Sequence, residues 1–470
     1  GTDGGGKSMT VTKGQELELQ VAGLAFGGRG LARVDGLTIF VDQTAPGDRV
    51  LARVVRRKQR YAEARLIRLL APSDHRVQPP CVYSGTCGGC KWQFLDYPEQ
   101  LRYKRAHVRE ALAHIGLLQG VTVHPTLPSP LSFGYRNKME FTCADRRWLL
   151  PAEIGRPGID PDFALGLHVP GTFHKVLDTA ACLLQPDMGN RLLAEIRGFL
   201  RSSPEPPYGL RSHQGFWRFV VLRHSVERDE WMVNLVTAAE KRSAVEPLAR
   251  QLMEAHPGVV SVVNNITARK AGVAVGEREL LLGGAPVIRD RIAPFEYEIS
   301  ANSFFQTNTR GAAQLYALVE RYARLTGAET VIDLYCGTGT IAISLSAAAR
   351  QVIGLEIVAG AVADAERNCR LNGVDNCRFV VGDIRQALGG VAEKAEVMVI
   401  DPPRMGMHGE VLQQVLARAP RRIVYVSCNP ATLARDIGGL KDAYAVREIQ
   451  PLDMFPHTFH IEAVARLERI

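Results

Sequence analysis

Hydrophobic and polar residues alternate along the first part of the chain, from residue 13 to residue 70. Gly, Asp and Pro turns divide this segment into short stretches, and a two-residue period is typical of β-strands buried on one face. The pattern predicts strands at 16–21, 31–34, 37–41, 48–55 and 61–69. Several short strands in so short a segment indicate a small closed barrel of the OB type.

The period then changes to that of a helix. Apolar residues at helical spacing after Pro98 predict a helix over 97–115, because proline is well tolerated in the first turn. Residues from about 121 to 290 give a mixed pattern, with apolar strands expected at 216–223, 231–236 and 259–264. This segment is expected to form a second, mixed α+β domain.

From about residue 330, apolar strands alternate with helical stretches. The strands are expected at 330–334, 351–356, 377–381, 397–400 and 422–427. Such alternation predicts a doubly wound, mostly parallel sheet of the α/β class. Ligands bind such sheets beyond the carboxyl ends of the strands, so the residues that follow each strand are the candidates for chemistry.

Composition narrows the setting of these domains. The chain has 470 residues, a net charge of +8 and a pI of about 9.0, which makes a polyanionic partner plausible. No run of 18 apolar residues occurs, so no membrane span is expected.

The nine cysteines are an odd number in a chain without a secretory signal, which favours a reducing cytoplasm. Residues 1–8 are typical of an expression-tag remnant, with Met9 as the native start. Basic residues cluster between Arg49 and Arg68, and an ordinary solvated face is the alternative to a polyanion-binding one. They are Arg53, Arg56, Arg57, Lys58, Arg60, Arg65 and Arg68.

Three strand ends suggest a cofactor site. Gly337 and Gly339 follow the first strand of the sheet, where glycine lets the backbone turn tightly beside a ligand. Glu356 ends the second strand and suits ribose hydroxyls, while Asp383 follows the third and could hold an adenine amino group. No glycine-rich pyrophosphate cradle is evident, which favours S-adenosylmethionine over a nicotinamide dinucleotide.

The fourth strand ends in Asp401-Pro402-Pro403-Arg404. Two prolines after a strand-terminal acid hold a rigid, extended edge. Enzymes that methylate exocyclic amines often carry an aromatic residue where Arg404 stands. The arginine therefore argues against an amine nitrogen as the methyl acceptor.

The fifth strand ends at Cys428, followed by the turn Asn429-Pro430. A buried structural cysteine is the alternative, but its place at the catalytic edge favours a nucleophile. A thiolate that adds to C6 of uracil makes C5 nucleophilic enough to take a methyl group, and a base must then remove the C5 proton. Glu462, at the head of an apolar strand, is the expected base, with His460 as the alternative.

A separate cluster, Cys81, Cys87 and Cys90 beside Gly88-Gly89, offers three soft metal ligands. With a fourth thiolate from elsewhere, the count suits zinc and an iron–sulfur cluster equally.

Together these features resemble the RNA uracil-5-methyltransferases, specifically the 23S rRNA type with an N-terminal TRAM barrel and an iron–sulfur cluster. The resemblance covers nearly the whole chain from Met9. The motifs that carry it are Phe305-Gln306-x-Asn308, Asp333-Leu334-Tyr335-Cys336-Gly337, Asp401-Pro402-Pro403-Arg404, Ser427-Cys428-Asn429-Pro430 and His460-Ile461-Glu462.

The resemblance implies roles for individual residues. It makes Cys428 the nucleophile and Glu462 the proton acceptor. It implies that S-adenosylmethionine is contacted by Gln306, Tyr335, Thr340, Glu356, Asp383 and Asp401. Thr340 stands where well-known members have asparagine, so this one contact is less secure. The family also implies a [4Fe–4S] cluster on Cys81, Cys87, Cys90 and Cys182, and Cys143 is the competing fourth ligand.

The expected organisation is a TRAM-like RNA-binding barrel at 9–72, a central iron–sulfur and RNA-binding domain at 73–290, and a Rossmann-like methyltransferase domain at 291–470. The expected protein is a cytoplasmic monomer that methylates a uridine of 23S rRNA at C5. The same chemistry on tRNA is the first alternative. A non-catalytic RNA-binding or ribosome-assembly module is the second, and it would need neither Cys428 nor Glu462.

Overall fold

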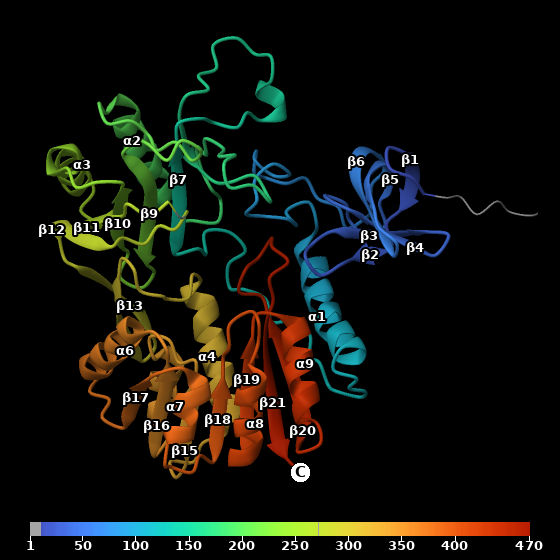
Figure 1. Ribbon diagram of the computed structural model, residues 1–470, viewed down its shortest axis with the longest axis vertical. Coiled ribbons are helices and arrows are strands. Elements are labelled where there is room, and N and C mark those ends of the chain that lie inside the picture. Colours follow the sequence, from blue (N-terminus) through green and yellow to red (C-terminus); the bar gives the residue numbers. More distant parts are fainter. Residues whose placement is uncertain (1–10, 271) are drawn as a thin grey trace, which may run out of the picture.

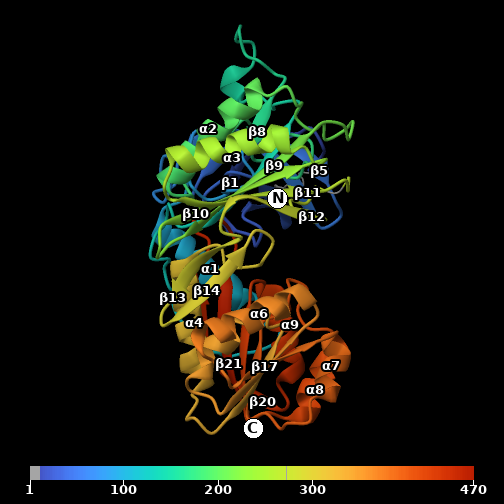
Figure 2. The same cartoon turned by 90° about the vertical axis from the view of Figure 1, so that its left-hand side faces the viewer.

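The computed structural model describes residues 11–270 and 272–470. The expected tag remnant at 1–8 lies outside the described residues. Figure 1 shows three parts: a small barrel-like sheet, a central α/β part and a C-terminal α/β part, with helix α1 between the first and the last. Figure 2 shows the central sheet above the C-terminal one, with the hairpin β13–β14 between them.

The N-terminal sheet contains the strands that the alternating pattern predicts. Its strands are β1 (Glu16–Gln20), β2 (Gly23–Leu24), β3 (Gly30–Val34), β4 (Leu37–Val41), β5 (Arg49–Arg57) and β6 (Tyr61–Ala71), in the order β1-β5-β6-β4-β3-β2. The inward residues of all the longer strands share one buried core. Only β2 was not expected, because two residues are too few to show a period.

Helix α1 (Tyr97–His114) has the predicted position. It begins there because the Asp96 carboxylate accepts a hydrogen bond from the Glu99 backbone N–H and Pro98 occupies the first turn. The helix buries one face against α9 (Pro430–Leu440) and β20 (Tyr444–Leu452) of the C-terminal part. That buried face includes a lysine, Lys104.

The central sheet has six strands in the order β12-β11-β10-β9-β7-β8. Their bounds are β7 (Lys138–Ala144), β8 (Ala164–Gly166), β9 (Trp217–Ser225), β10 (Glu230–Thr237), β11 (Val259–Ile266) and β12 (Arg278–Gly284). A short 3-10 helix (Pro151–Glu153) and helices α2 (Asp187–Ser202) and α3 (Arg242–Ala255) accompany them, and the hairpin β13 (Val287–Ile292) and β14 (Phe295–Ser300) follows. The three predicted strands are β9, β10 and β11; the predicted domain boundary at 290 falls within β13.

The C-terminal sheet has seven strands in the order β17-β16-β15-β18-β19-β21-β20. The five predicted parallel strands are β15 (Thr330–Leu334), β16 (Gln351–Glu356), β17 (Cys377–Val381), β18 (Val397–Ile400) and β19 (Arg422–Ser427). Helices α4 (Thr309–Ala323), α5 (Thr340–Ser346), α6 (Ala359–Asn372), α7 (Ile384–Gly390), α8 (Gly409–Arg418) and α9 cover the sheet.

The last strand, β21 (Glu462–Arg469), determines what meets at the catalytic edge. It pairs antiparallel with β19, with Ser427 opposite Ala463. The amino end of β21 therefore lies beside the carboxyl end of β19, which brings Glu462 and Cys428 to the same edge of the sheet.

None of the helices in the described ranges is long and apolar enough to cross a membrane.

Candidate active site

A cleft of about 940 Å³ opens at the carboxyl edge of the C-terminal sheet. Residues that follow β15, β16, β18 and β19 line it, together with the loops before α4 and β21. Of the predicted site residues, the cleft brings together Gln306, Tyr335, Thr340, Glu356, Asp401, Cys428 and Glu462. Asp383 is not among the residues that line it.

The loop after β15 bends sharply into the cleft. Both Tyr335 and Gly339 have a positive φ, of 63° and 74° respectively. Only glycine fits at 339, because a Cβ there would lie 2.8 Å from the Ala365 Cβ and 3.0 Å from the Phe379 ring. This close packing against α6 and β17 fixes the start of α5, so the floor of the cleft is rigid.

Glu356 closes the loop from the neighbouring strand. Its carboxylate accepts hydrogen bonds from the backbone N–H groups of Gly337, at 3.1 Å, and Val358, at 2.9 Å. The Thr340 hydroxyl, the position that departs from the family pattern, accepts a hydrogen bond from the Tyr316 hydroxyl at 2.9 Å. Its own proton remains available to a ligand in the cleft.

Asp383 lies after β17, where its carboxylate caps α7 and accepts hydrogen bonds from Arg385 at 3.0 Å. These hydrogen bonds to Arg385 lower the pKa of Asp383 to about 2. An ionised carboxylate at this strand end can still accept a hydrogen bond, although one of its faces is already occupied.

Cys428 stands in a turn that hydrogen bonds hold on both sides. The Asn429 N–H donates to the Ser427 hydroxyl at 3.1 Å, and the Asn429 carboxamide caps α9 through the Ala431 N–H. The Asn429 amide also donates to the Arg404 carbonyl at 3.0 Å. One asparagine thus connects the thiol-bearing turn to the Pro-Pro-Arg loop.

Two carboxyl groups share the cleft with the thiol. Burial raises the pKa of Asp401 to about 7. Burial, followed by the negative charge of Asp401, raises the pKa of Glu462 to about 8. Burial and then the charges of Glu462 and Asp401 raise the pKa of the Cys428 thiol to about 11, and the Arg404 guanidinium acts in the opposite direction. These shifts produce carboxyl groups that can exchange protons near neutral pH.

His460, the alternative base, also lines the cleft. Burial, followed by the positive charges of Arg404, Lys104 and Arg136, lowers its pKa to about 4. The imidazole is therefore neutral at physiological pH.

The cleft also contains residues that were not predicted from the sequence, among them Arg136 and Tyr316. Arg136 precedes β7 in the central part, and Tyr316 lies on α4. Neither follows a strand of the parallel sheet, so the strand-end rule could not identify them. Arg136 also lines the cysteine pocket, and so lies between the two cavities.

A second cavity, the cysteine pocket, has a volume of about 170 Å³ and contains Cys81, Cys87, Cys90 and Cys182 in its lining. Burial raises the pKa of Cys87 to about 11 and that of Cys90 to about 12. Cys143, the competing ligand, is fully buried in β7 and is not part of this lining. Across the described ranges, no group of three or more His, Cys, Asp or Glu side chains has the arrangement of a metal site.

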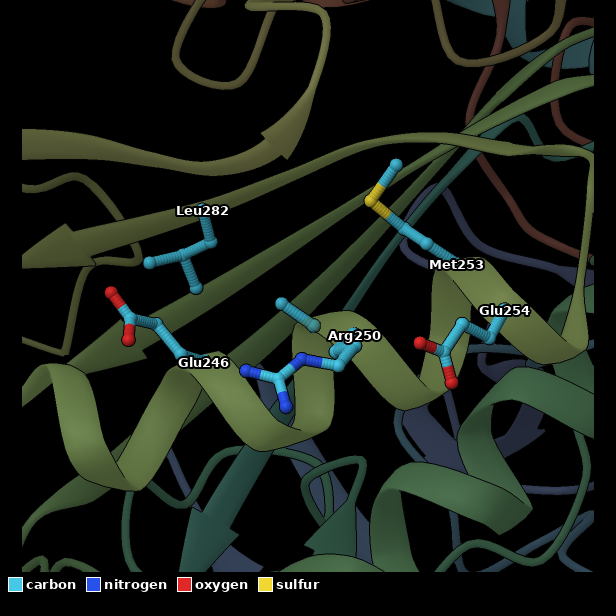
Figure 3. Close-up of a pocket in the computed structure, with 6 residues that line it drawn as sticks. Glu246, Arg250, Met253, Glu254 and Leu282 are labelled. Atoms are coloured by element: carbon cyan, nitrogen blue, oxygen red, sulfur yellow. The ribbon is translucent and has the colours of Figure 1, made fainter.

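A shallow hollow between α3 and β12 differs from both cavities (Figure 3). Glu246, Arg250 and Glu254 project from one face of α3 beside Met253, opposite Leu282. Residues four apart on a helix share a face, and alternating charges there are typical of an ordinary solvated surface. No predicted site residue lines this hollow.

The order of the C-terminal sheet and the cleft at its carboxyl edge define a class I S-adenosylmethionine-dependent methyltransferase. Two family models match the chain: tRNA (uracil-5-)-methyltransferase over residues 277–470 and TRAM domain over residues 10–67. The chain belongs to the RNA uracil-5-methyltransferase family with a TRAM domain.

Relatives match along nearly the full length. An uncharacterized RNA methyltransferase of Chlorobaculum tepidum is 42% identical over 98% of both chains. One of Porphyromonas gingivalis is 39% identical over 96% of this chain and 99% of its own. The crystal structure of Pyrococcus abyssi tRNA (uracil-54, C5)-methyltransferase in complex with S-adenosyl-L-homocysteine has a TM-score of 0.73 and 28% identity, and the match covers 96% of this chain and all of that one.

The raised pKa of Glu462 predicts how stability depends on pH. In the unfolded chain a glutamate loses its proton near 4.5, whereas the folded protein holds it until about 8. The free energy of unfolding should therefore fall as pH rises from 5 to 8. Glu462→Gln removes this dependence, so its free energy of unfolding relative to wild type should be roughly 3 kcal/mol higher at pH 8 than at pH 5.

Urea titrations of both proteins at the two pH values measure this difference. Glu393→Gln is the matched control: hydrogen bonds lower the pKa of Glu393, so its carboxylate is ionised in both the folded and the unfolded chain between pH 5 and 8, and the variant should keep the wild-type pH dependence. Equal wild-type and Glu462→Gln profiles would contradict the burial argument.

Proposed function

We propose that this chain methylates C5 of a uridine in 23S rRNA to give 5-methyluridine, through a covalent bond between Cys428 and uracil C6. The observation that carries the proposal is the meeting of one thiol and two carboxyl groups with raised pKa values in a single cleft. A non-catalytic RNA-binding module would have no use for such a group.

The reaction begins at Cys428. Its sulfur bonds to C6, the C5=C6 electron pair moves toward O4, and the thiol proton passes to a carboxylate in the cleft. Asp401 suits this acceptance, since its pKa of about 7 leaves much of it ionised at neutral pH. The adduct is then nucleophilic at C5.

When bound, S-adenosylmethionine supplies the methyl group. The residues that would hold it are Gln306, Tyr335, Thr340, Glu356 and Asp401, with Asp383 at the adenine side. They fit the cofactor, because the carboxylate of Glu356 is fixed by backbone donors at the end of the second strand, where ribose hydroxyls bind in doubly wound folds.

Glu462 completes the cycle. It accepts the C5 proton, the C5=C6 bond re-forms, the C6–S bond breaks and the thiolate leaves. The thiolate then regains its proton from Asp401, and Glu462 releases the C5 proton to solvent. The ionised form of a carboxyl with a pKa of about 8 is a stronger base than an ordinary glutamate, which suits removal of a carbon-bound proton, and the share of this ionised form grows as pH rises toward 8.

The substrate assignment is supported by the motif resemblance to the 23S rRNA type, and by a TRAM match that covers the basic strands of the barrel. A specific observation favours tRNA as the second candidate: the similar Pyrococcus abyssi structure is a tRNA (uracil-54, C5)-methyltransferase.

The proposal includes a [4Fe–4S] cluster in the cysteine pocket. Four cysteines line one small cavity, and thiolate sulfur is the donor that iron–sulfur clusters require. The ligands would be Cys81, Cys87, Cys90 and Cys182. Methyl transfer moves no electrons, so the role we propose for the cluster is structural.

Covalent catalysis predicts that one variant fails to form the protein–RNA adduct and that another accumulates it. Cys428→Ala should abolish methyl transfer while S-adenosylmethionine still binds, because the thiol acts on the base. With 5-fluorouridine at the target, wild type should form a protein–RNA adduct that survives a denaturing gel. Glu462→Gln should accumulate the methylated adduct on normal RNA.

Substantial turnover by Cys428→Ala would refute the nucleophile. Normal product release by Glu462→Gln would transfer the base role to His460 or water.

The substrate prediction is tested with separate 23S rRNA and tRNA transcripts. Because the resemblance is to the rRNA type, the kcat/KM of wild type for the 23S transcript should be at least about tenfold higher than its kcat/KM for the tRNA transcript. Mass mapping of nucleosides in each RNA identifies the product, and Cys428→Ala is the blank. Preference for tRNA would establish the second candidate.

The cluster predicts colour and iron content. Protein purified without oxygen should be brown, with about four irons per chain. Cys182→Ala should bleach it, because one ligand is lost, whereas Cys143→Ala should remain brown. Colourless protein with one tightly bound zinc would reject the iron–sulfur cluster. Bleaching by Cys143→Ala alone would show that the fourth ligand is Cys143.

A further inference from the structure

The segment 453–461, here called the base loop, joins β20 to β21 and ends one residue before Glu462. In Figure 1 it is the red loop that rises from the C-terminal sheet toward the space between α1 and the central part. Most of it is buried, including Asp453, His457 and Ile461. Because it carries His460 and leads directly into Glu462, its position affects how the proposed base faces the thiol, in addition to the sheet pairing that holds β21.

A fully buried ion pair holds the start of the base loop. The Lys104 ammonium of α1 lies 2.6 Å from the Asp453 carboxylate, and both side chains have no exposed surface. The same ammonium donates to the Phe455 carbonyl at 3.2 Å. The Asp453 carboxylate in turn accepts the Phe455 N–H at 3.0 Å. Lys104 therefore fixes both the side chain and the backbone of this turn.

A second set of contacts holds the middle of the loop. The Gln100 side-chain carbonyl accepts the His457 N–H at 2.9 Å, and its amide lies 3.2 Å from the His457 Nδ1. The backbone N–H groups of Lys91 and Trp92 both donate to the His457 carbonyl at 3.0 Å. The Phe133 ring stacks on the His457 ring, with 4.2 Å between the ring centroids.

These contacts share one property: they come from residues 91–133, outside the catalytic sheet. The loop has a non-glycine positive φ of 66° at His457, a conformation that persists when the surroundings fix it. The lysine that contacts the start of the loop is costly to desolvate. Burial lowers the pKa of Lys104, and the charge of Asp453 acts to raise it. Because burying two charges costs free energy, an ion pair of this kind suggests that the position of the loop matters for function.

We propose that Lys104, supported by Gln100, is a positioning residue for removal of the C5 proton: it holds the base loop so that Glu462 faces the adduct on Cys428. This rests on the proposed function. Lys104 touches neither substrate nor cofactor in this assignment, and it acts through Asp453 and Phe455. Loss of its charge should therefore impair elimination more than cofactor binding or methyl transfer.

The test compares Lys104→Met with Arg109→Met, an exposed cation on the same helix. Both variants are assayed in single turnovers on target RNA, with the methylated adduct measured on denaturing gels and released product by nucleoside mapping. Lys104→Met should slow release of product by about 10- to 100-fold, as expected for a displaced general base. Its adduct fraction should approach that of Glu462→Gln. The dissociation constant of S-adenosylmethionine should change less than about twofold, and Arg109→Met should match wild type.

Two further variants keep the test decisive if Lys104→Met is unstable. Gln100→Ala leaves the ion pair intact but loses the His457 contacts, and should raise the adduct fraction in the same direction. Lys104→Met combined with Asp453→Asn removes both charges while keeping the acceptor for the Phe455 N–H, and should recover part of the release rate.

An unchanged partition between adduct and product in Lys104→Met and Gln100→Ala, beside a normal wild-type adduct, would overturn the inference alone. An equal loss of methyl transfer and release in both variants would also overturn it, since that is the result of a purely structural role. Absence of any adduct in wild type, with 5-fluorouridine present, would refute the covalent mechanism and this inference together.

Discussion

The buried ion pair between Lys104 and Asp453 is the interaction on which the geometry of the catalytic edge depends. Neither side chain reaches solvent, so each charge is tolerated only because the other lies 2.6 Å away. The pair joins a helix before the central sheet to the connection between the last two strands of the C-terminal sheet. Through this pair, the position of helix α1 relative to the C-terminal sheet affects the position of the base loop at the cleft.

The same desolvation that makes this pair demanding also sets the chemistry of the cleft. Asp401, Glu462 and Cys428 all have raised pKa values, and burial is the largest cause for each. Within the described residues neither carboxyl group forms an ion pair, and the Arg404 guanidinium offsets only part of the rise in the pKa values of Glu462 and Cys428. A cleft that keeps water away from these groups therefore holds protons ready for transfer near neutral pH.

Much of this architecture could be predicted from local pattern. The five parallel strands have the predicted bounds, because apolar runs between polar turns are unambiguous when helices separate them. The meeting of most strand-end residues in one cleft was predictable for the same reason, although Asp383 does not line it. The central part was harder: β9, β10 and β11 were predicted as apolar runs, but the three-residue β8 and the largely exposed β12 were not, and Pro247 lies inside α3. Lys104 was not predictable, because a lysine on a helix is ordinarily exposed and its partner lies 349 residues away.

The base loop has a consequence for how this enzyme can be divided or recombined. The family match begins at residue 277, and a segment cut there would keep every strand of the catalytic sheet. It would lose Lys104, Gln100 and Phe133, and with them the ammonium that pairs with Asp453 and the contacts that hold His457. A chimera joined at that point would likewise set the loop of one parent against the helix of another. The smallest transplantable catalytic unit is therefore discontinuous: the sheet together with a helix that is synthesised well before it.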